Sequence, residues 1–348
     1  MSDQIAFVFP GQGSQAVGMG ADIAAASPAA RRVFAIADAA VGFPLSELCF
    51  NGPEAALRET INTQPAIVAT SLALLAALQE AAGAPETAAG REPSLRVPLR
   101  PEYVAGHSVG EYTALAAAGA LEIGDALRLV RERGRLMHAE GLACASGMAA
   151  VLGMDAAALE AVCVEATARA SAEPGATARG RHPGRGKVVL ANDNAPGQIV
   201  ISGERRALDL AMELARERGA KRVVPLAVSG AFHSPVMAPA AVGLARAVEA
   251  APVGDARVPL VANISARPLL LAADVRQELA QQIAAPVQWT ASVRYLVERG
   301  ITTFVEIGVG QVLSGLIRRI AKGTTTLTVG SAAEVAPAAA RLRELVGV

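Results

Sequence analysis

The chain has 348 residues and is 52% hydrophobic, enough to bury a large core in two domains, or in one domain with an insertion. Its 32 basic and 32 acidic residues balance, which argues against a nucleic-acid binder because such proteins normally carry a basic face. Three scattered cysteines, Cys49, Cys144 and Cys163, match neither a metal-site spacing nor an even disulfide framework. We therefore expect no bound metal and a reducing, cytoplasmic compartment.

Hydropathy along the chain predicts a soluble protein without a membrane partner. A strand-like run, IAFVFP, is already present at residues 5–10, so we expect no cleavable leader before it. No run of about 18 apolar residues lacks a charge or a turn signal, so we expect no membrane-spanning helix.

Short β-branched runs alternate with long helical runs, which is the pattern of an α/β fold. Strands are predicted at residues 5–10, 103–108, 258–264 and 302–308. Helices are predicted at roughly residues 20–40, 65–82, 109–119, 123–142, 273–284, 288–299 and 310–322. The Pro-rich segment 84–101 is typical of a surface loop.

Residues 144–228 show a different order of elements, β-α-β-β-α-β, which predicts a ferredoxin-like arrangement. Its two middle strands flank a predicted turn at residues 194–197. We expect this small domain to be inserted in an α/β-hydrolase-like large domain formed by residues 1–143 and 229–348. Within it, residues 170–187 are rich in Gly, Pro, Ala and Arg. They are either a flexible insertion or a basic flap that contacts an anionic ligand or an acidic partner.

Ser108 stands between two glycines in the sequence Gly106-His107-Ser108-Val109-Gly110, after a predicted strand and before a predicted helix. Glycines at these positions allow a sharp turn that exposes the serine oxygen above the sheet. The helix that follows directs its first backbone N–H groups at that oxygen. The alternative is a chance Gly-x-Ser-x-Gly match in a chain that has 33 glycines.

A serine nucleophile needs a base, and the chain has 4 histidines. His107 is next to the serine and should point away, His138 follows a charged helical run, and His182 lies in the Arg/Gly-rich insertion. His233, which follows the last strand of the small domain, is the best candidate by elimination, although it could also be a buried structural histidine. No carboxylate stands out as the group that orients the base, and a backbone carbonyl could fill that position.

A second Gly-rich loop, FPGQGSQ at residues 9–15, directly follows the first predicted strand. It lacks the Lys-Ser/Thr ending of a P-loop and the complete Gly-x-Gly-x-x-Gly pattern, so it is a weak nucleotide site. Placed beside Ser108, the backbone N–H groups of Gln12 and Val109 would form an oxyanion hole.

These motifs, with four more, occur in an order that resembles the malonyl-CoA:acyl-carrier-protein transacylase family of fatty acid synthesis. The resemblance runs from about residue 4 to about residue 330. It is carried by FPGQGSQ (9–15), TQPAIVATS (63–71), GHSVGEY (106–112), RERGRLM (131–137), NDNAPGQIVISG (192–203), GAFHSPVM (230–237) and PVQW (286–289). The segments 84–101 and 170–187 look longer than is usual in the family.

The resemblance implies a ping-pong transfer of malonyl from coenzyme A to a serine, and then to the phosphopantetheine thiol of acyl carrier protein. It implies no cofactor other than the coenzyme A thioester, which is the substrate. Ser108 matches the nucleophile, His233 the base, and Gln12 and Val109 the oxyanion donors. Gln282 matches the position whose main-chain carbonyl orients the histidine. Gln64 and Asn194 match polar residues that line the cleft between the two domains.

Arg133 matches the family's arginine for the free carboxylate of malonate. A guanidinium can bind that carboxylate bidentately, and an acetyl group would leave it unpaired. Spacing alone instead favours a surface arginine in the charged run Arg128, Arg131, Arg133 and Arg135.

Phe232, directly before the histidine, matches a position at which malonyl-specific acyltransferases tend to carry phenylalanine. Its ring would leave no room for the extra methyl group of methylmalonyl. The alternative is a core aromatic that supports the hinge of the small domain.

Three other functions stay open at this point. A serine thioesterase or hydrolase would use the same turn around Ser108, residues 106–110, which we call the elbow. The acyltransferase subunit of malonate decarboxylase would use the same chemistry with another carrier. A non-enzymatic acyl-binding scaffold is the third. We expect a monomer.

Overall fold

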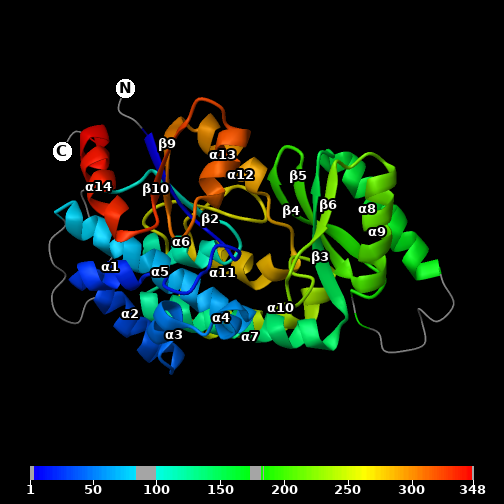
Figure 1. Ribbon diagram of the computed structural model, residues 1–348, viewed down its shortest axis with the longest axis horizontal. Helices are drawn as coiled ribbons and strands as arrows, with labels where there is room; N and C mark the ends of the chain where they lie inside the picture. The colour runs from blue at the N-terminus through cyan, green and yellow to red at the C-terminus, as the bar shows by residue number, and fades with distance from the viewer. Residues whose placement is uncertain (1–3, 84–98, 173–181, 183, 347–348) are drawn as a thin grey trace.

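The protein is described by a computed structural model that covers residues 4–83, 99–172, 182 and 184–346 (Figure 1). Two sheets organise it, a parallel-rich sheet on the left of Figure 1 and an antiparallel sheet on the right. The mixed α/β class expected from the sequence is confirmed at this level.

The larger sheet has six strands in the order β10-β9-β1-β2-β7-β8. All neighbours pair in parallel except β8, which is antiparallel to β7. Because β1 and β2 are adjacent and parallel, their carboxyl ends bring loop 10–15 and Ser108 to the same edge of the sheet. The strands are β1 Gln4–Phe9, β2 Tyr103–Gly106, β7 Leu260–Val261, β8 Pro268–Leu269, β9 Ile301–Ile307 and β10 Thr325–Val329.

Helices cover both faces of this sheet. Alternate residues of β1 face different cores: Phe7 and Phe9 join a core with α2, α5, α6, α7, α10 and α14, whereas Ala6 and Val8 join one with α12 and α13. The helices are α1 Ala21–Ala26, α2 Pro28–Val41, α3 Leu45–Asn51, α4 Glu54–Arg58, α5 Thr60–Ala81, α6 Gly110–Ala117, α7 Ile123–Ala143, α10 Ala238–Ala250, α11 Ala272–Gln281, α12 Trp289–Glu298, α13 Val312–Ile320 and α14 Ala332–Val346.

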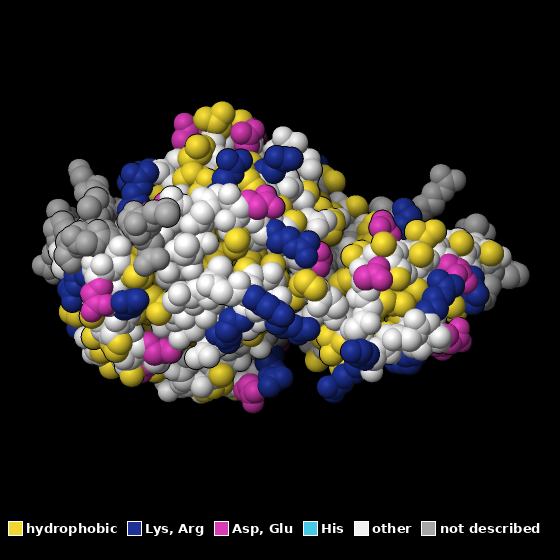
Figure 2. Space-filling view, turned by 90° about the horizontal axis from the view of Figure 1, so that it is seen from above, with side chains coloured by type: hydrophobic (Ala, Val, Ile, Leu, Met, Phe, Trp, Pro, Cys, Tyr) yellow, Lys and Arg dark blue, Asp and Glu magenta, His cyan; other side chains and the backbone are white. Residues whose placement is uncertain are grey.

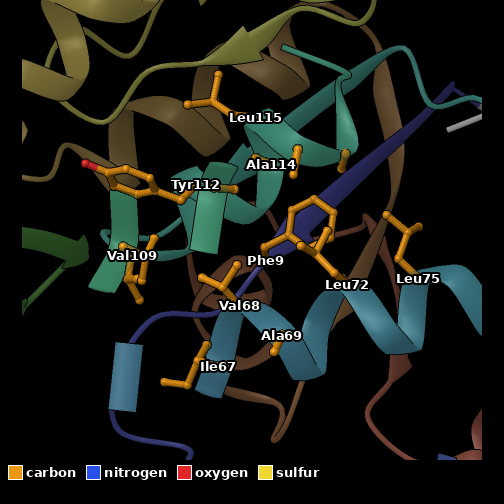
Figure 3. Packing of buried hydrophobic residues seen from close by; sticks show 14 of the residues in the cluster. Phe9, Ile67, Val68, Ala69, Leu72, Leu75, Val109, Tyr112, Ala114 and Leu115 are labelled. Carbon is orange, nitrogen blue, oxygen red and sulfur yellow. The ribbon is translucent and has the colours of Figure 1, made fainter. Parts of the chain in front are cut away.

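Helix α5 lies at the centre of the first core. Phe9 of β1 packs beside Val68 and Leu72 of α5 and near the first turns of α6 (Figure 3). By length and composition alone α5 passes as a membrane span, but 89% of its apolar window is buried inside the protein. Its apolar composition is therefore accounted for by this core.

The smaller sheet is antiparallel, with the strand order β4-β5-β3-β6. Helices α8 and α9 cover one face through an apolar cluster that includes Leu159, Ile201 and Leu208. The opposite face contributes Met148 and Val200 to the core of the larger sheet. The elements are β3 Ser146–Leu152, α8 Ala156–Ala172, β4 Val188–Ala195, β5 Gln198–Glu204, α9 Arg205–Glu217 and β6 Arg222–Pro225.

Several boundaries differ from the expected ones. The segment 20–40 forms two helices, because the Ser27 hydroxyl caps α2 and Pro28 occupies its first turn. Helix α5 begins at Thr60 rather than at residue 65 and contains Pro65. The predicted turn 194–197 is tighter, since Ala195 pairs with Gln198. Elements α3, α4, α10, β8, β10 and α14 were not predicted. Residues 84–98, 173–181 and 183 lie outside the described residues.

Candidate active site

Ser108 lies at a sharp turn between β2 and α6. Its φ is 52°, a conformation uncommon for a residue with a side chain and frequent at strained functional sites. A Cβ on Gly106 would come within 2.0 Å of the Gly110 backbone, and one on Gly110 within 2.2 Å of Phe9 O. Only glycine fits at both positions, so the Gly-x-Ser-x-Gly sequence is a structural requirement of this turn and not a chance match.

His233 is hydrogen-bonded to the serine. Its Nε2 lies 2.8 Å from Ser108 Oγ. Its Nδ1 lies 3.0 Å from the carbonyl oxygens of both Gln282 and Ala285. Two acceptors at Nδ1 hold the proton there, so Nε2 is free to accept the serine proton. No carboxylate is needed for this orientation.

The His233 ring is held neutral. Burial, and then the positive charge of Arg133, lower its pKa to about 3. The backbone is also fixed, with φ at 57° and the His233 N–H donating to Ile283 O at 2.8 Å. In the free protein the imidazole is therefore an uncharged acceptor at neutral pH.

Arg133, on α7, is fully buried, so the surface alternative is wrong. Its Nη1 donates to Gln64 Oε1 at 2.6 Å, and its Nη2 donates to Gln282 Oε1 at 2.8 Å and to Ser108 Oγ at 3.1 Å. Within the described part of the chain, its buried Nε has no hydrogen-bond partner, and no ion pair includes this guanidinium. A buried cation beside the nucleophile is thus open to an anion.

Loop 10–15 packs against the elbow. A Cβ on Gly11 would lie 2.7 Å from His107 O, so the loop and the turn are in close contact just before Gln12. Val109 directly precedes α6, where helical N–H groups lack internal partners. Of the two residues expected to donate backbone N–H groups, Val109 directly follows Ser108, and Gln12 directly follows the Gly11 contact with His107.

The other predicted site residues have definite positions. Gln64 is fully buried and its side-chain oxygen accepts from Arg133 Nη1. It therefore holds the guanidinium and does not line an open cleft. Asn194 Oδ1 lies 2.8 Å from His107 Nε2, which ties the hairpin of the smaller sheet to the elbow. Phe232 is 5% exposed and joins the large core beside His233.

Sequence reasoning missed a layer of polar residues beneath the elbow. Asn263, two residues after the end of β7, accepts from the Ser108 N–H at 2.7 Å and donates from Nδ2 to Gly106 O at 2.7 Å. Glu111, on α6, accepts from the Asn263 N–H at 2.9 Å. The local signal was weak: Asn263 is the polar residue of the otherwise apolar run VPLVANI, and Glu111 follows Ser108 by three residues in GHSVGEY.

Two hollows border the smaller sheet, one near the loop after β6 and one at the edge strand β4. One, of about 520 Å³, is lined by Gln12, Thr60, His138 and Ser229, near the loop that follows β6. The other, of about 650 Å³, is lined by His233 and the edge strand β4. From above, the surface narrows between the two halves of the molecule, and Lys and Arg side chains border this constriction (Figure 2).

Residues 6–341 match the family described as acyl transferase domain. The malonyl CoA-acyl carrier protein transacylase of Bacillus subtilis is 41% identical over 341 residues, which are 98% of each chain. That of Escherichia coli K12 is 38% identical over 97% of this chain and 99% of its own. The chain belongs to the malonyl-CoA:acyl-carrier-protein transacylase family.

Solved structures of this transacylase family share the whole fold. The malonyl CoA-acyl carrier protein transacylase of Coxiella burnetii has a TM-score of 0.85 at 34% identity, over 98% of both chains. A polyketide malonyl-transacylase, solved in complex with its acyl-carrier protein, has a TM-score of 0.84 at 35% identity, over 97% of this chain and 99% of its own. Because the chain belongs to this family, it is an acyltransferase, and the alternative of a non-enzymatic acyl-binding scaffold is rejected.

Proposed function

We propose that the protein transfers malonyl from malonyl-CoA to the phosphopantetheine thiol of acyl carrier protein through an ester on Ser108. The names of its transacylase relatives support this substrate pair. The observation that carries the proposal is the position of Ser108 Oγ, which lies between His233 Nε2 at 2.8 Å and Arg133 Nη2 at 3.1 Å. A base and a carboxylate-binding cation thus meet at one hydroxyl.

In the first half-reaction, Ser108 Oγ attacks the thioester carbonyl and its proton moves to His233 Nε2. The N–H groups of Gln12 and Val109 hold the oxygen that becomes negative. When the tetrahedral intermediate collapses, the C–S bond breaks and His233 returns the proton to the coenzyme A thiolate. In the second half-reaction, the carrier thiol loses its proton to His233, attacks the ester, and Ser108 leaves as the hydroxyl.

Arg133 selects the acyl group. The malonyl carboxylate would replace the contact between Arg133 Nη2 and Ser108 Oγ, while Gln64 and Gln282 keep the guanidinium in place. An acetyl group has no carboxylate, so it would leave the buried charge without an anion. Phe232, packed beside His233, is proposed to close the wall at the acyl α-carbon, and Asn194 to hold the hairpin of the smaller sheet against the elbow.

The hollow lined by Gln12, Thr60 and Ser229 is proposed to hold the pantetheine arm, because Gln12, a proposed oxyanion donor, is among its lining residues. Basic side chains at the constriction suit the phosphates of coenzyme A and an acidic carrier surface (Figure 2). No cofactor and no metal takes part in the proposed reaction.

We also propose the domain assignments, the oligomeric state and the cellular compartment. The large domain, residues 1–143 and 229–348, is α/β-hydrolase-like, and the inserted small domain, residues 144–228, is ferredoxin-like. The order β4-β5-β3-β6 with two helices on one face supports the latter assignment. The protein is proposed to act as a cytoplasmic monomer that supplies fatty acid synthesis.

A partition experiment tests transfer against hydrolysis. Labelled malonyl-CoA is mixed with the enzyme, with or without a carrier protein that bears phosphopantetheine, and label is counted in carrier and in free malonate. Transfer requires that most label reaches the carrier and that little malonate forms without it. Steady release of malonate at the same rate in both samples would instead identify a thioesterase.

A further inference from the structure

A buried carboxylate, Glu111, lies one side chain away from the guanidinium of Arg133. Glu111 is fully buried on α6 and accepts three N–H donors. Its Oε1 accepts from the Asn263 N–H at 2.9 Å and from Asn263 Nδ2 at 3.0 Å, and its Oε2 accepts from Gln282 Nε2. All three contacts donate to the carboxylate, so this arrangement accommodates the ionised form.

These contacts fix the orientation of the Gln282 side-chain amide. Gln282 Nε2 faces Glu111 Oε2 and also donates to Ser108 O at 2.9 Å. The amide oxygen is therefore directed to the other side, where it accepts from Arg133 Nη2 at 2.8 Å. A flipped amide would lose both contacts. Its NH₂ would face the guanidinium, and both of these groups donate, while its oxygen would face Glu111 Oε2, and both of these atoms accept.

The same contacts also bear on the buried positive charge of Arg133. Arg133 is buried without an ion pair among the described residues, and such a charge is costly unless an anion or polar groups stabilise it. The Gln282 amide oxygen, which the contact with Glu111 orients, is one such polar group, and it leaves the guanidinium free on the side of Ser108. A direct partner would instead compete with the carboxylate of the substrate.

We propose that Glu111 is a positioning residue for acyl selection, which acts through the Gln282 amide to aim Arg133 at Ser108. This inference rests on the proposed malonyl transfer and adds a residue to it. Glu111 touches neither the substrate nor the reacting atoms in this account.

Burial, and then the neighbouring carboxylate of Glu278, raise the pKa of Glu111 well above its usual value, although the Asn263 and Gln282 donors act to lower it. Arg133 in turn is influenced by Glu111, whose negative charge raises the pKa of the guanidinium against the effect of burial.

The test compares Glu111→Gln with Glu278→Gln as a matched control. Glu278 is also buried and accepts from the Ile264 N–H at 2.9 Å, but no contact joins it to Gln282 or Arg133 among the described residues. In Glu111→Gln, a new NH₂ would face Gln282 Nε2 and turn that amide. Rates of Ser108 acylation by malonyl-CoA and acetyl-CoA are measured by mass spectrometry, together with the melting temperature.

We expect Glu111→Gln to acylate with malonyl roughly 10- to 100-fold more slowly, the effect of losing one hydrogen bond to a charged group. The malonyl-over-acetyl ratio should fall, while Glu278→Gln keeps the wild-type ratio. Gln282→Met removes the amide but keeps the main-chain carbonyl, and adding it to Glu111→Gln should cause no further loss.

Wild-type rates and ratio in Glu111→Gln, or fully additive losses in the double variant, would overturn the inference. If Glu111→Gln does not fold, Gln282→Met decides alone: an unchanged malonyl-over-acetyl ratio overturns the inference, and a reduced one supports it. A wild-type protein that forms no malonyl adduct would instead defeat the proposed function itself.

Discussion

Arg133 Nη2 donates to Ser108 Oγ at 3.1 Å, so in the free protein the guanidinium and the hydroxyl are joined directly. The serine O–H then points to His233 Nε2, and the oxygen accepts from the cation. The same charge contributes to the low pKa of His233. Acyl selection and the basicity of the histidine therefore depend on one side chain.

Arg133→Ala should lose malonyl transfer and reduce the malonyl-over-acetyl ratio by about 10- to 100-fold, the effect of losing charge-assisted hydrogen bonds. Some acetyl transfer should appear, because no buried charge is left unpaired. Competition between the two thioesters measures the ratio, and Arg128→Ala, an exposed arginine on the same helix, is the control. An unchanged ratio in Arg133→Ala would contradict this role.

His233→Ala should slow acylation by about 10²–10⁴-fold, the range usual for loss of a general base. His138→Ala is the matched control, since His138 lies on α7 and lines the neighbouring hollow without contacting Ser108. Stopped-flow release of coenzyme A gives both rates. If His138→Ala were the more damaging change, the base would be wrongly assigned.

The His233 ring should stay neutral between pH 8 and pH 5, because burial and Arg133 lower its pKa to about 3. The unfolded chain takes up this proton below about pH 6.5, and the folded protein does not. The contribution of His233 to stability is thus complete above that pH and is lost as the pH falls toward 3. Ring resonances in NMR spectra report the titration. Arg133→Met should raise the pKa, and a wild-type midpoint near 6.5 would contradict the geometry.

Phe232→Ser should admit methylmalonyl. Overpacking by one methyl group costs about 1–3 kcal/mol, which corresponds to roughly 10–200-fold in discrimination. Methylmalonyl-CoA should then begin to label Ser108, while malonyl labelling survives at a lower rate. If labelling by both substrates falls in proportion to the folded fraction, Phe232 is only a core aromatic.

Local patterns predicted the elements that position the site. The glycines around Ser108 and the strand at residues 5–10 have strong local signals, and the structure places both as expected. Elements α14 and β10 were missed because an Ala-rich helix and a Thr-rich strand at the end of the chain have weak periodicity. The start of α5 was predicted at Pro65 because proline is common in the first turn of a helix. Here Pro65 lies beyond the first turn, and the helix begins at Thr60.

Contacts over long sequence distances could not be predicted in the same way. The spacing of arginines along α7 favoured a surface position for Arg133. The residue is buried because α7 packs against α5 and Gln282. Glu111 and Asn263 are separated by 152 residues, so no local pattern relates them. The resemblance supplied Gln282 for its main-chain carbonyl, whereas the contacts of its amide side chain are seen only in the fold.

Peptide mapping of the acylated enzyme tests the central claim most directly. The protein is mixed with malonyl-CoA, quenched in acid and digested, and the modified peptide is sequenced by mass spectrometry before and after the phosphopantetheine-bearing carrier is added. The account predicts one malonyl ester per chain, on Ser108, that disappears when the carrier is added and is absent from Ser108→Ala. A full adduct on Ser108→Ala, or one located on another residue, would contradict it.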